Sequence, residues 1–185
     1  AEGEILVNHN GNDLLYYTRA KAGEGVWDGP YAIPNPENID EVVKGEGNAL
    51  EWARIVTTGE NNDVVHIFAN ALGDTNVASY YLRTADLQNW DIKFSPLEMD
   101  NLHINFYAAD DYVVSTNGDR IAVLYCEGFG SHVMLYESAD AGLTWESRMV
   151  WESPLHGKDW ETDESTLMEY LYGPTHGSVA IGADG

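Results

Sequence analysis

Eight acidic, aromatic and basic side chains stand just before three short β-rich runs, at residues 55–58, 113–116 and 178–181. They are Glu51, Trp52 and Arg54, then Asp110, Asp111 and Tyr112, then Tyr172 and His176. Aromatic rings that stack on sugar faces, combined with polar groups that fix hydroxyls, are typical of glycan sites. Solvated loops carry the same residue types for reasons of hydration alone, so both interpretations stay open at this point.

The charge balance restricts the class of partner. The chain has 31 acidic and 9 basic residues, a net charge of −22. Because this charge repels phosphate backbones and anionic lipids, we expect no nucleic-acid partner, and without a long apolar run we expect no membrane insertion. The six histidines are scattered without metal-ligand spacing, so no metal site is predicted. Ca²⁺, which binds carboxylate oxygens, is the one cofactor that the acidic surplus favours, although solubility alone accounts for the surplus.

A repeat runs along most of the chain. Strand-like runs alternate with turn residues, which predicts β-hairpins and no long helix. The second strands align over residues 16–22, 80–86 and 134–140, and each is followed by a tryptophan: Trp27, Trp90 and Trp145. Repeats of this length with several strands each are typical of β-propeller blades.

One copy of the repeat is the most specific motif. Its defining positions, in the order Ser-x-Asp-x-Gly-x-Thr-Trp, are Ser138, Asp140, Gly142, Thr144 and Trp145. This segment resembles the Asp-box of sialidase-like (BNR-repeat) β-propellers. A second copy keeps Asp86 and Trp90 but lacks the glycine, and around Ala22 even the aspartate is missing. In such a turn the Asp and the Ser or Thr bind turn backbone, and the Trp anchors the outer strand. Asp140 and Asp86 are therefore predicted to build turns.

The resemblance predicts an all-β fold, a β-propeller of four-stranded antiparallel blades. A single domain, 1–185, holds about three blades in segments 1–35, 50–97, 110–152 and 177–185, half of a six-bladed ring. Expected strands are 4–10, then 54–58, 64–70, 79–84 and 90–95, then 112–116, 120–126, 133–138 and 145–151, and finally 178–181. The strand 178–181 needs a neighbour equivalent to 4–10, since an open edge would otherwise remain. The remaining blades come from the same longer chain or from a second copy.

The resemblance also frames the function. Sialidases use an arginine triad, but of the five arginines only Arg54 stands at the expected channel mouth, so sialidase activity by this chain alone is not expected. We predict a secreted or cell-surface propeller that binds a glycan or a protein surface at that mouth. The alternatives are a carbohydrate-active enzyme, a glycosidase or a polysaccharide lyase using His103, Tyr107 and His176, and a structural module of a larger surface protein. The sequence names no catalytic residue that decides between them.

Overall fold

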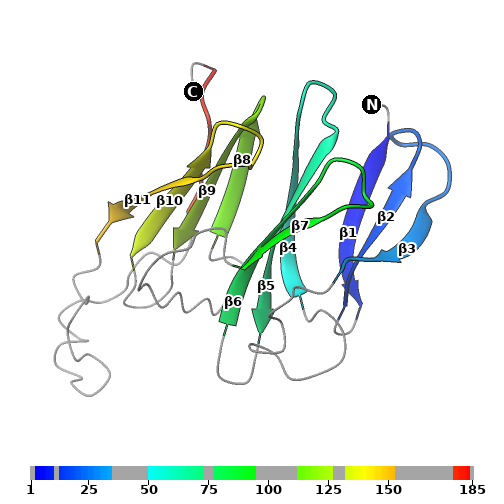
Figure 1. Ribbon diagram of the computed structural model, residues 1–185, viewed down its shortest axis with the longest axis horizontal. Coiled ribbons are helices and arrows are strands. Elements are labelled where there is room, and N and C mark those ends of the chain that lie inside the picture. Colours follow the sequence, from blue (N-terminus) through cyan, green and yellow to red (C-terminus); the bar gives the residue numbers. More distant parts are fainter. Residues whose placement is uncertain are drawn as a thin grey trace. The chain divides into compact units, whose positions relative to one another are not determined.

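The computed structural model describes residues 3–10, 13–34, 50–72, 77–94, 112–126, 132–152 and 177–183. These residues form three antiparallel sheets and no helix, which confirms the all-β prediction (Figure 1). The described part of the chain accordingly has no helix that could cross a membrane. The chain divides into two compact units, Ala1–Glu98 and Met99–Gly185, and each is described by itself.

Among the described residues, seven strands belong to the first unit and four to the second. The first unit contains β1 (Glu4–Asn10), β2 (Asp13–Arg19), β3 (Asp28–Ala32), β4 (Leu50–Thr58), β5 (Val64–Leu72), β6 (Val77–Thr84) and β7 (Asp91–Phe94). The second contains β8 (Tyr112–Asn117), β9 (Arg120–Cys126), β10 (Val133–Ser138) and β11 (Glu146–Trp151). The sheets are ordered β1-β2-β3, β4-β5-β6-β7 and β11-β10-β9-β8, so each pairs strands in chain order as a meander.

The core of the first unit lies between its two sheets. Alternating side chains of β5 and β6, among them Ile67 and Leu82, pack with Leu14 and Tyr16 of β2. This is the face that period-two alternation brings to one side of a strand. The Tyr16 hydroxyl donates to the Leu87 carbonyl oxygen at 3.0 Å, which ties β2 to the turn after β6. One face of each sheet is therefore buried against the other sheet.

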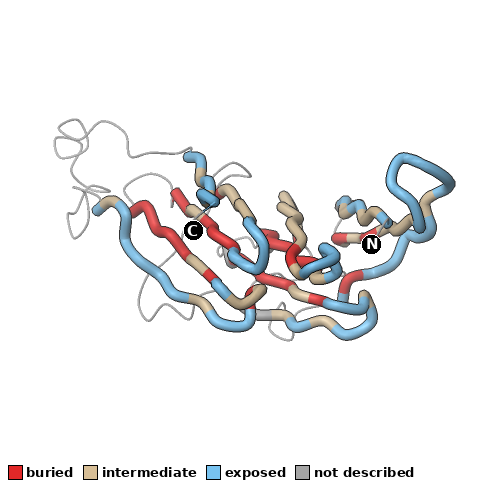
Figure 2. The backbone as a smooth tube through the Cα atoms, turned by 90° about the horizontal axis from the view of Figure 1, so that it is seen from above, coloured by how far each residue is buried: buried red, intermediate tan, exposed pale blue. Residues whose placement is uncertain are grey.

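In the second unit the central strands β9 and β10 are largely buried, whereas the outer strand β11 is mostly exposed (Figure 2). Three tyrosines fill the space along this sheet. Tyr112 stacks on Tyr125 with ring centroids 5.3 Å apart, and Tyr136 meets Tyr125 edge-on at 5.5 Å. In the first sheet the central strand β2 is half-buried, and the outer strand β3 is exposed throughout.

Two strand predictions need correction. Residues 178–181 are not part of any strand, so the predicted inner strand there is wrong for the single chain. The first strand of the second sheet begins at Leu50 rather than at Arg54, because β4 continues through an irregularity in its pairing with β5. The other predicted strands are present, with boundaries that differ by a few residues.

Candidate functional site

The turn between β10 and β11 is held by its own side chains. The Ser138 hydroxyl accepts the Gly142 N–H at 2.9 Å and donates to Asp140 at 2.9 Å. The two Asp140 carboxylate oxygens accept the Thr144 N–H at 2.9 Å and the Thr144 hydroxyl at 2.6 Å. The Trp145 indole N–H donates to the Gly142 carbonyl at 3.2 Å. The polar atoms of this motif are thus directed into the turn itself.

The turn between β6 and β7 repeats this arrangement without the glycine. One Asp86 oxygen accepts the N–H groups of Gln88 and Asn89 at 2.9 and 2.7 Å, and the Thr84 hydroxyl accepts the Leu87 N–H at 2.8 Å. Leu87 takes the positive φ of 60° that a glycine would adopt more easily. The Asn89 N–H lowers the pKa of Asp86 to about 2.

The same effect acts on the complete motif. The Thr144 hydroxyl, followed by the Thr144 N–H, lowers the pKa of Asp140 to about 2. A carboxyl group with such a pKa is ionised at neutral pH and does not act as a general acid there. Both aspartates are accordingly hydrogen-bond acceptors of their turns.

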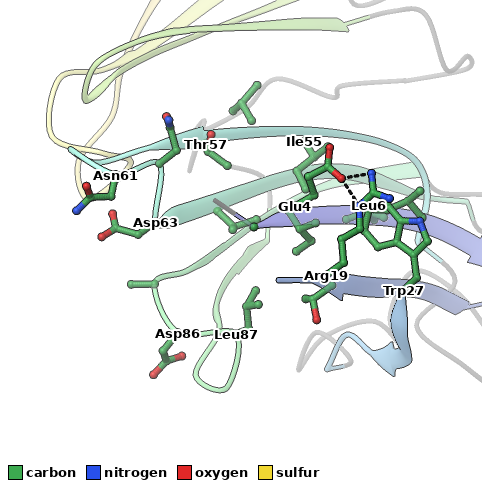
Figure 3. Close-up of a pocket in the computed structure, with 18 residues that line it drawn as sticks. Glu4, Leu6, Arg19, Trp27, Ile55, Thr57, Asn61, Asp63, Asp86 and Leu87 are labelled. Carbon is green, nitrogen blue, oxygen red and sulfur yellow. Dashed lines mark hydrogen bonds and ion pairs between the residues drawn. The ribbon is translucent and has the colours of Figure 1, made fainter. Parts of the chain in front are cut away.

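The third turn lacks an aspartate, and a carboxylate from a neighbouring strand occupies its role. Glu4 of β1 accepts the Gly23 N–H at 3.1 Å and is bonded to the Arg19 guanidinium. The Gly23 N–H and Arg19 hold the pKa of Glu4 below its usual value. The Arg19 guanidinium also lies over the Trp27 ring, 4.5 Å from the centroid, so strand, turn and tryptophan are joined in one cluster (Figure 3).

The predicted mouth residues of the first run lie within a β-bulge. Glu51 pairs with Asn70 and Arg54 with Phe68, so Trp52 and Ala53 together oppose a single residue of β5. Trp52 has a φ of 53°, a left-handed conformation that is costly for a bulky residue. The prediction that Glu51 and Trp52 precede the strand is therefore wrong: both belong to β4 together with Arg54, which was predicted as a strand residue. All three side chains are partly buried.

A buried polar pair lies beside this bulge. The Ser79 hydroxyl of β6 donates to the Asn70 amide oxygen of β5 at 2.7 Å, and both residues are almost fully buried. The Asn70 amide nitrogen has no hydrogen-bond partner among the described residues. Because an unpaired buried donor is costly, such a group indicates strain or a role beyond stability. No sequence pattern distinguishes Asn70 from other strand asparagines.

The other predicted mouth residues differ in outcome. Tyr112 is only 1% exposed and stacks on Tyr125, so its predicted role as an exposed stacking surface is wrong. Asp110, Asp111, Tyr172 and His176 lie outside the described residues, and their roles stay predictions.

A polar cluster of a different kind is buried in the same sheet. The two ring nitrogens of His66 lie 2.7 Å from the Thr58 hydroxyl and 2.8 Å from the Tyr81 hydroxyl. His66 and Tyr81 are fully buried, and Thr58 is 1% exposed. This arrangement links β4, β5 and β6 from within, and its burial keeps it from substrates. Within the described residues, no group of three His, Cys, Asp or Glu side chains is placed to hold a metal ion.

Among the described residues, Arg19, Arg83 and Arg148 pair with carboxylates. Besides the Arg19–Glu4 pair, Arg83 lies 3.5 Å from Asp91 and Arg148 lies 3.2 Å from Glu137. Each pair joins neighbouring strands of one sheet. These guanidinium groups are therefore occupied by structural partners.

A pocket of about 960 Å³ opens in the first unit, bordered by β1 and β4 (Figure 3). The Glu4, Arg19 and Trp27 cluster lies along one part of its wall, and Asp63 and Asp86 lie along another. The sequence predicted no site here, because the lining comes from strands and turns far apart in the chain.

Comparisons with known proteins add little. No family model matches the chain, and no curated protein matches it. A solved structure of β-1,2-mannobiose phosphorylase from Listeria innocua, in complex with β-1,2-mannobiose, is similar at 16% identity and a TM-score of 0.44. The similarity covers 75% of this chain, which spans 36% of the length of that enzyme chain. A likeness this weak establishes neither fold nor function, and the resemblance to sialidase-like propellers is not confirmed.

Proposed function

We propose that the sheets are blades of a β-propeller and that the chain binds a neutral glycan beside the β4 bulge. Two four-stranded meanders with similar hydrogen-bonded turns support the blade architecture, since repeated units of this kind build propellers. A location outside the cell or at its surface belongs to the same proposal.

The observation that carries the proposed site is the left-handed Trp52 in the bulge. Bulges are frequent next to binding sites, where they redirect a side chain, and strained residues persist where they serve a role. Glu51 and Arg54 belong to the same part of β4 as Trp52 and carry hydrogen-bonding groups of both signs. Asn70, whose amide nitrogen has no partner among the described residues, pairs with Glu51 from β5. An aromatic ring with polar neighbours is suited to a sugar ring and its hydroxyls.

Charge indicates which glycans fit. The net charge of −22 repels acidic polysaccharides. Arg19, Arg83 and Arg148, which could neutralise a substrate carboxylate, already pair with carboxylates of the protein. A neutral glycan avoids both difficulties.

A glycan array with neutral and acidic members, followed by titration calorimetry, tests the proposal. Trp52→Asn removes the ring but keeps a residue that tolerates positive φ. We expect binding to weaken at least about tenfold, which corresponds to about 1.4 kcal/mol. Ala141→Asn is the matched control, because Ala141 also has a positive φ of 53° but lies in the turn after β10. Unchanged binding by Trp52→Asn, or a preference for acidic glycans, would contradict the proposal.

A further inference from the structure

The pocket beside β1 runs along the edges of two strands. Five consecutive residues, 3–7, line it from β1 and the residue before it, and three consecutive residues, 55–57, line it from β4. A sheet face contributes alternate residues to a pocket, because neighbouring side chains point to opposite sides. Consecutive lining residues therefore indicate a groove bounded by strand edges.

Strand β1 lacks a neighbour that its counterparts have. The strands with the repeated segment are β2, β6 and β10, and they pair with β1, β5 and β9. On their other sides β5 pairs with β4 and β9 with β8, whereas β1 pairs only with β2 within the described residues. Leu6, near the middle of this edge, is 40% exposed. An open edge with apolar side chains is suited to the addition of another strand.

A second segment of the same chain resembles a strand in sequence but belongs to no sheet among the described residues. Residues 178–181 align in sequence with the first strands of the other two sheets, yet they belong to no sheet. The segment is fixed to the second unit near its two ends. Gly177 packs so tightly that an added Cβ would lie 2.8 Å from Leu124, and the Gly182 carbonyl accepts the Asn117 amide at 2.8 Å. Between these points Ser178 and Ala180 are exposed.

We propose that residues 177–183 of a second copy of this chain enter the groove and pair with β1. In a strand, Val179 and Ile181 would share one face and would cover the apolar side of the groove. At about 3.3 Å per residue a seven-residue segment extends about 23 Å, which matches the seven residues of β1.

Exchange of residues 177–183 between two copies would give the β1 edge a neighbouring strand and would give the segment a sheet to join. Each copy carries one open β1 edge and one segment 177–183, so a two-fold pair fills both edges with the same contact. Two copies of about three blades each would make a six-bladed ring, within the four to eight blades that propellers contain. The proposal that residues 177–183 pair with β1 is argued from the strand edges. The assignment of that segment to a second copy rests on the proposed propeller architecture.

Light scattering on the 185-residue chain gives the first test. We expect a dimer of twice the 20.5 kDa chain mass. Val179→Asp combined with Ile181→Asp should give a folded monomer that keeps the far-UV strand signal of the three sheets, because these residues are outside those sheets. The control, Val26→Asp with Leu143→Asp, adds the same charges at sites that are 90% and 57% exposed and should stay dimeric. A monomeric unmodified chain, or a dimer that persists in the first variant, overturns the proposal.

Cross-linking identifies the occupant. A Leu6→Cys chain is mixed with a Val179→Cys chain and treated with a short bis-maleimide, while Cys126 stays buried in both. We expect a product that joins the two different chains. No such product, or a link formed only within a chain carrying both cysteines, overturns the assignment to a second copy. Because the glycan test with Trp52→Asn involves neither residue, failure of one proposal is distinguishable from failure of the other.

Discussion

The Asn70–Ser79 pair allows a prediction in which removing polar groups stabilises the protein. Both side chains are buried, at 1% and 3% exposure, and they share one hydrogen bond of 2.7 Å. The second hydrogen-bonding group of Asn70, its amide nitrogen, has no partner among the described residues. The pair therefore combines a favourable contact with an unfavourable burial.

The sign of the change in unfolding free energy depends on which of these two contributions is larger. A hydrogen bond contributes about 0.5–1.5 kcal/mol net, and a buried unsatisfied donor costs about 1–3 kcal/mol. Asn70→Leu with Ser79→Ala removes both effects, so we expect the free energy of unfolding to rise by about 1 kcal/mol. Ser79→Ala alone leaves the Asn70 oxygen unpaired as well, and we expect it to lower the free energy of unfolding by about 1–3 kcal/mol.

Urea unfolding followed by tryptophan fluorescence measures these differences. With a slope of about 2 kcal/mol/M, the double variant should unfold at about 0.5 M more urea than the unmodified chain. If the unpaired donor is kept for binding, the stabilised variant should also bind the glycan more weakly. A double variant less stable than the unmodified chain by 1 kcal/mol or more would refute the reasoning, because it would mean that the Asn70 amide has a partner.

Two further predictions concern hydrogen-bonded side chains. Thr58→Val and Tyr81→Phe each remove a hydroxyl bonded to buried His66, so each should lower the free energy of unfolding by about 1–3 kcal/mol. Their double-mutant cycle should show a coupling of at least about 0.5 kcal/mol, and strictly additive effects would argue against a shared imidazole. The pKa values of Asp140 and Asp86 are lowered to about 2, so their stabilisation is present above about pH 4 and is lost as the pH falls toward 2. Asp140→Asn should flatten urea midpoints measured across this range, and an unchanged pH profile would contradict the turn bonds.

Local signals allowed the strands and turns to be predicted. Short runs of β-branched, aromatic and other apolar residues between turn residues mark β5, β6, β9 and β10 without tertiary information. The side-chain hydrogen bonds of the turn after β10 lie within residues 138–145, so the motif that forms them can be recognised from a short window of sequence. The strand predicted at 178–181 was wrong because a strand also needs a partner strand, and the local sequence does not show whether one is present.

The candidate site depends on contacts between residues that are far apart in the chain, and the sequence did not predict those contacts. Tyr112 looked like a mouth residue by its position, but stacking on Tyr125 across the β8–β9 pair buries it. The sequence gives no indication of the bulge at Trp52, because glycine usually occupies such a left-handed position and tryptophan occupies it here. Asn70 became notable only when its neighbours on β4 and β6 were placed around it.

The turn near Ala22 shows what a decayed motif can still do. That turn has lost its aspartate, yet Glu4 from the adjacent strand accepts a turn N–H, and Arg19 fixes the carboxylate. What the turn requires is an acceptor oxygen near its backbone donors, and a carboxylate from outside the motif meets this need. A motif count therefore underestimates repeats of this kind. In this repeat the replacement is Glu4, which stands at the start of β1 and pairs through the strand register with Arg19 at the end of β2.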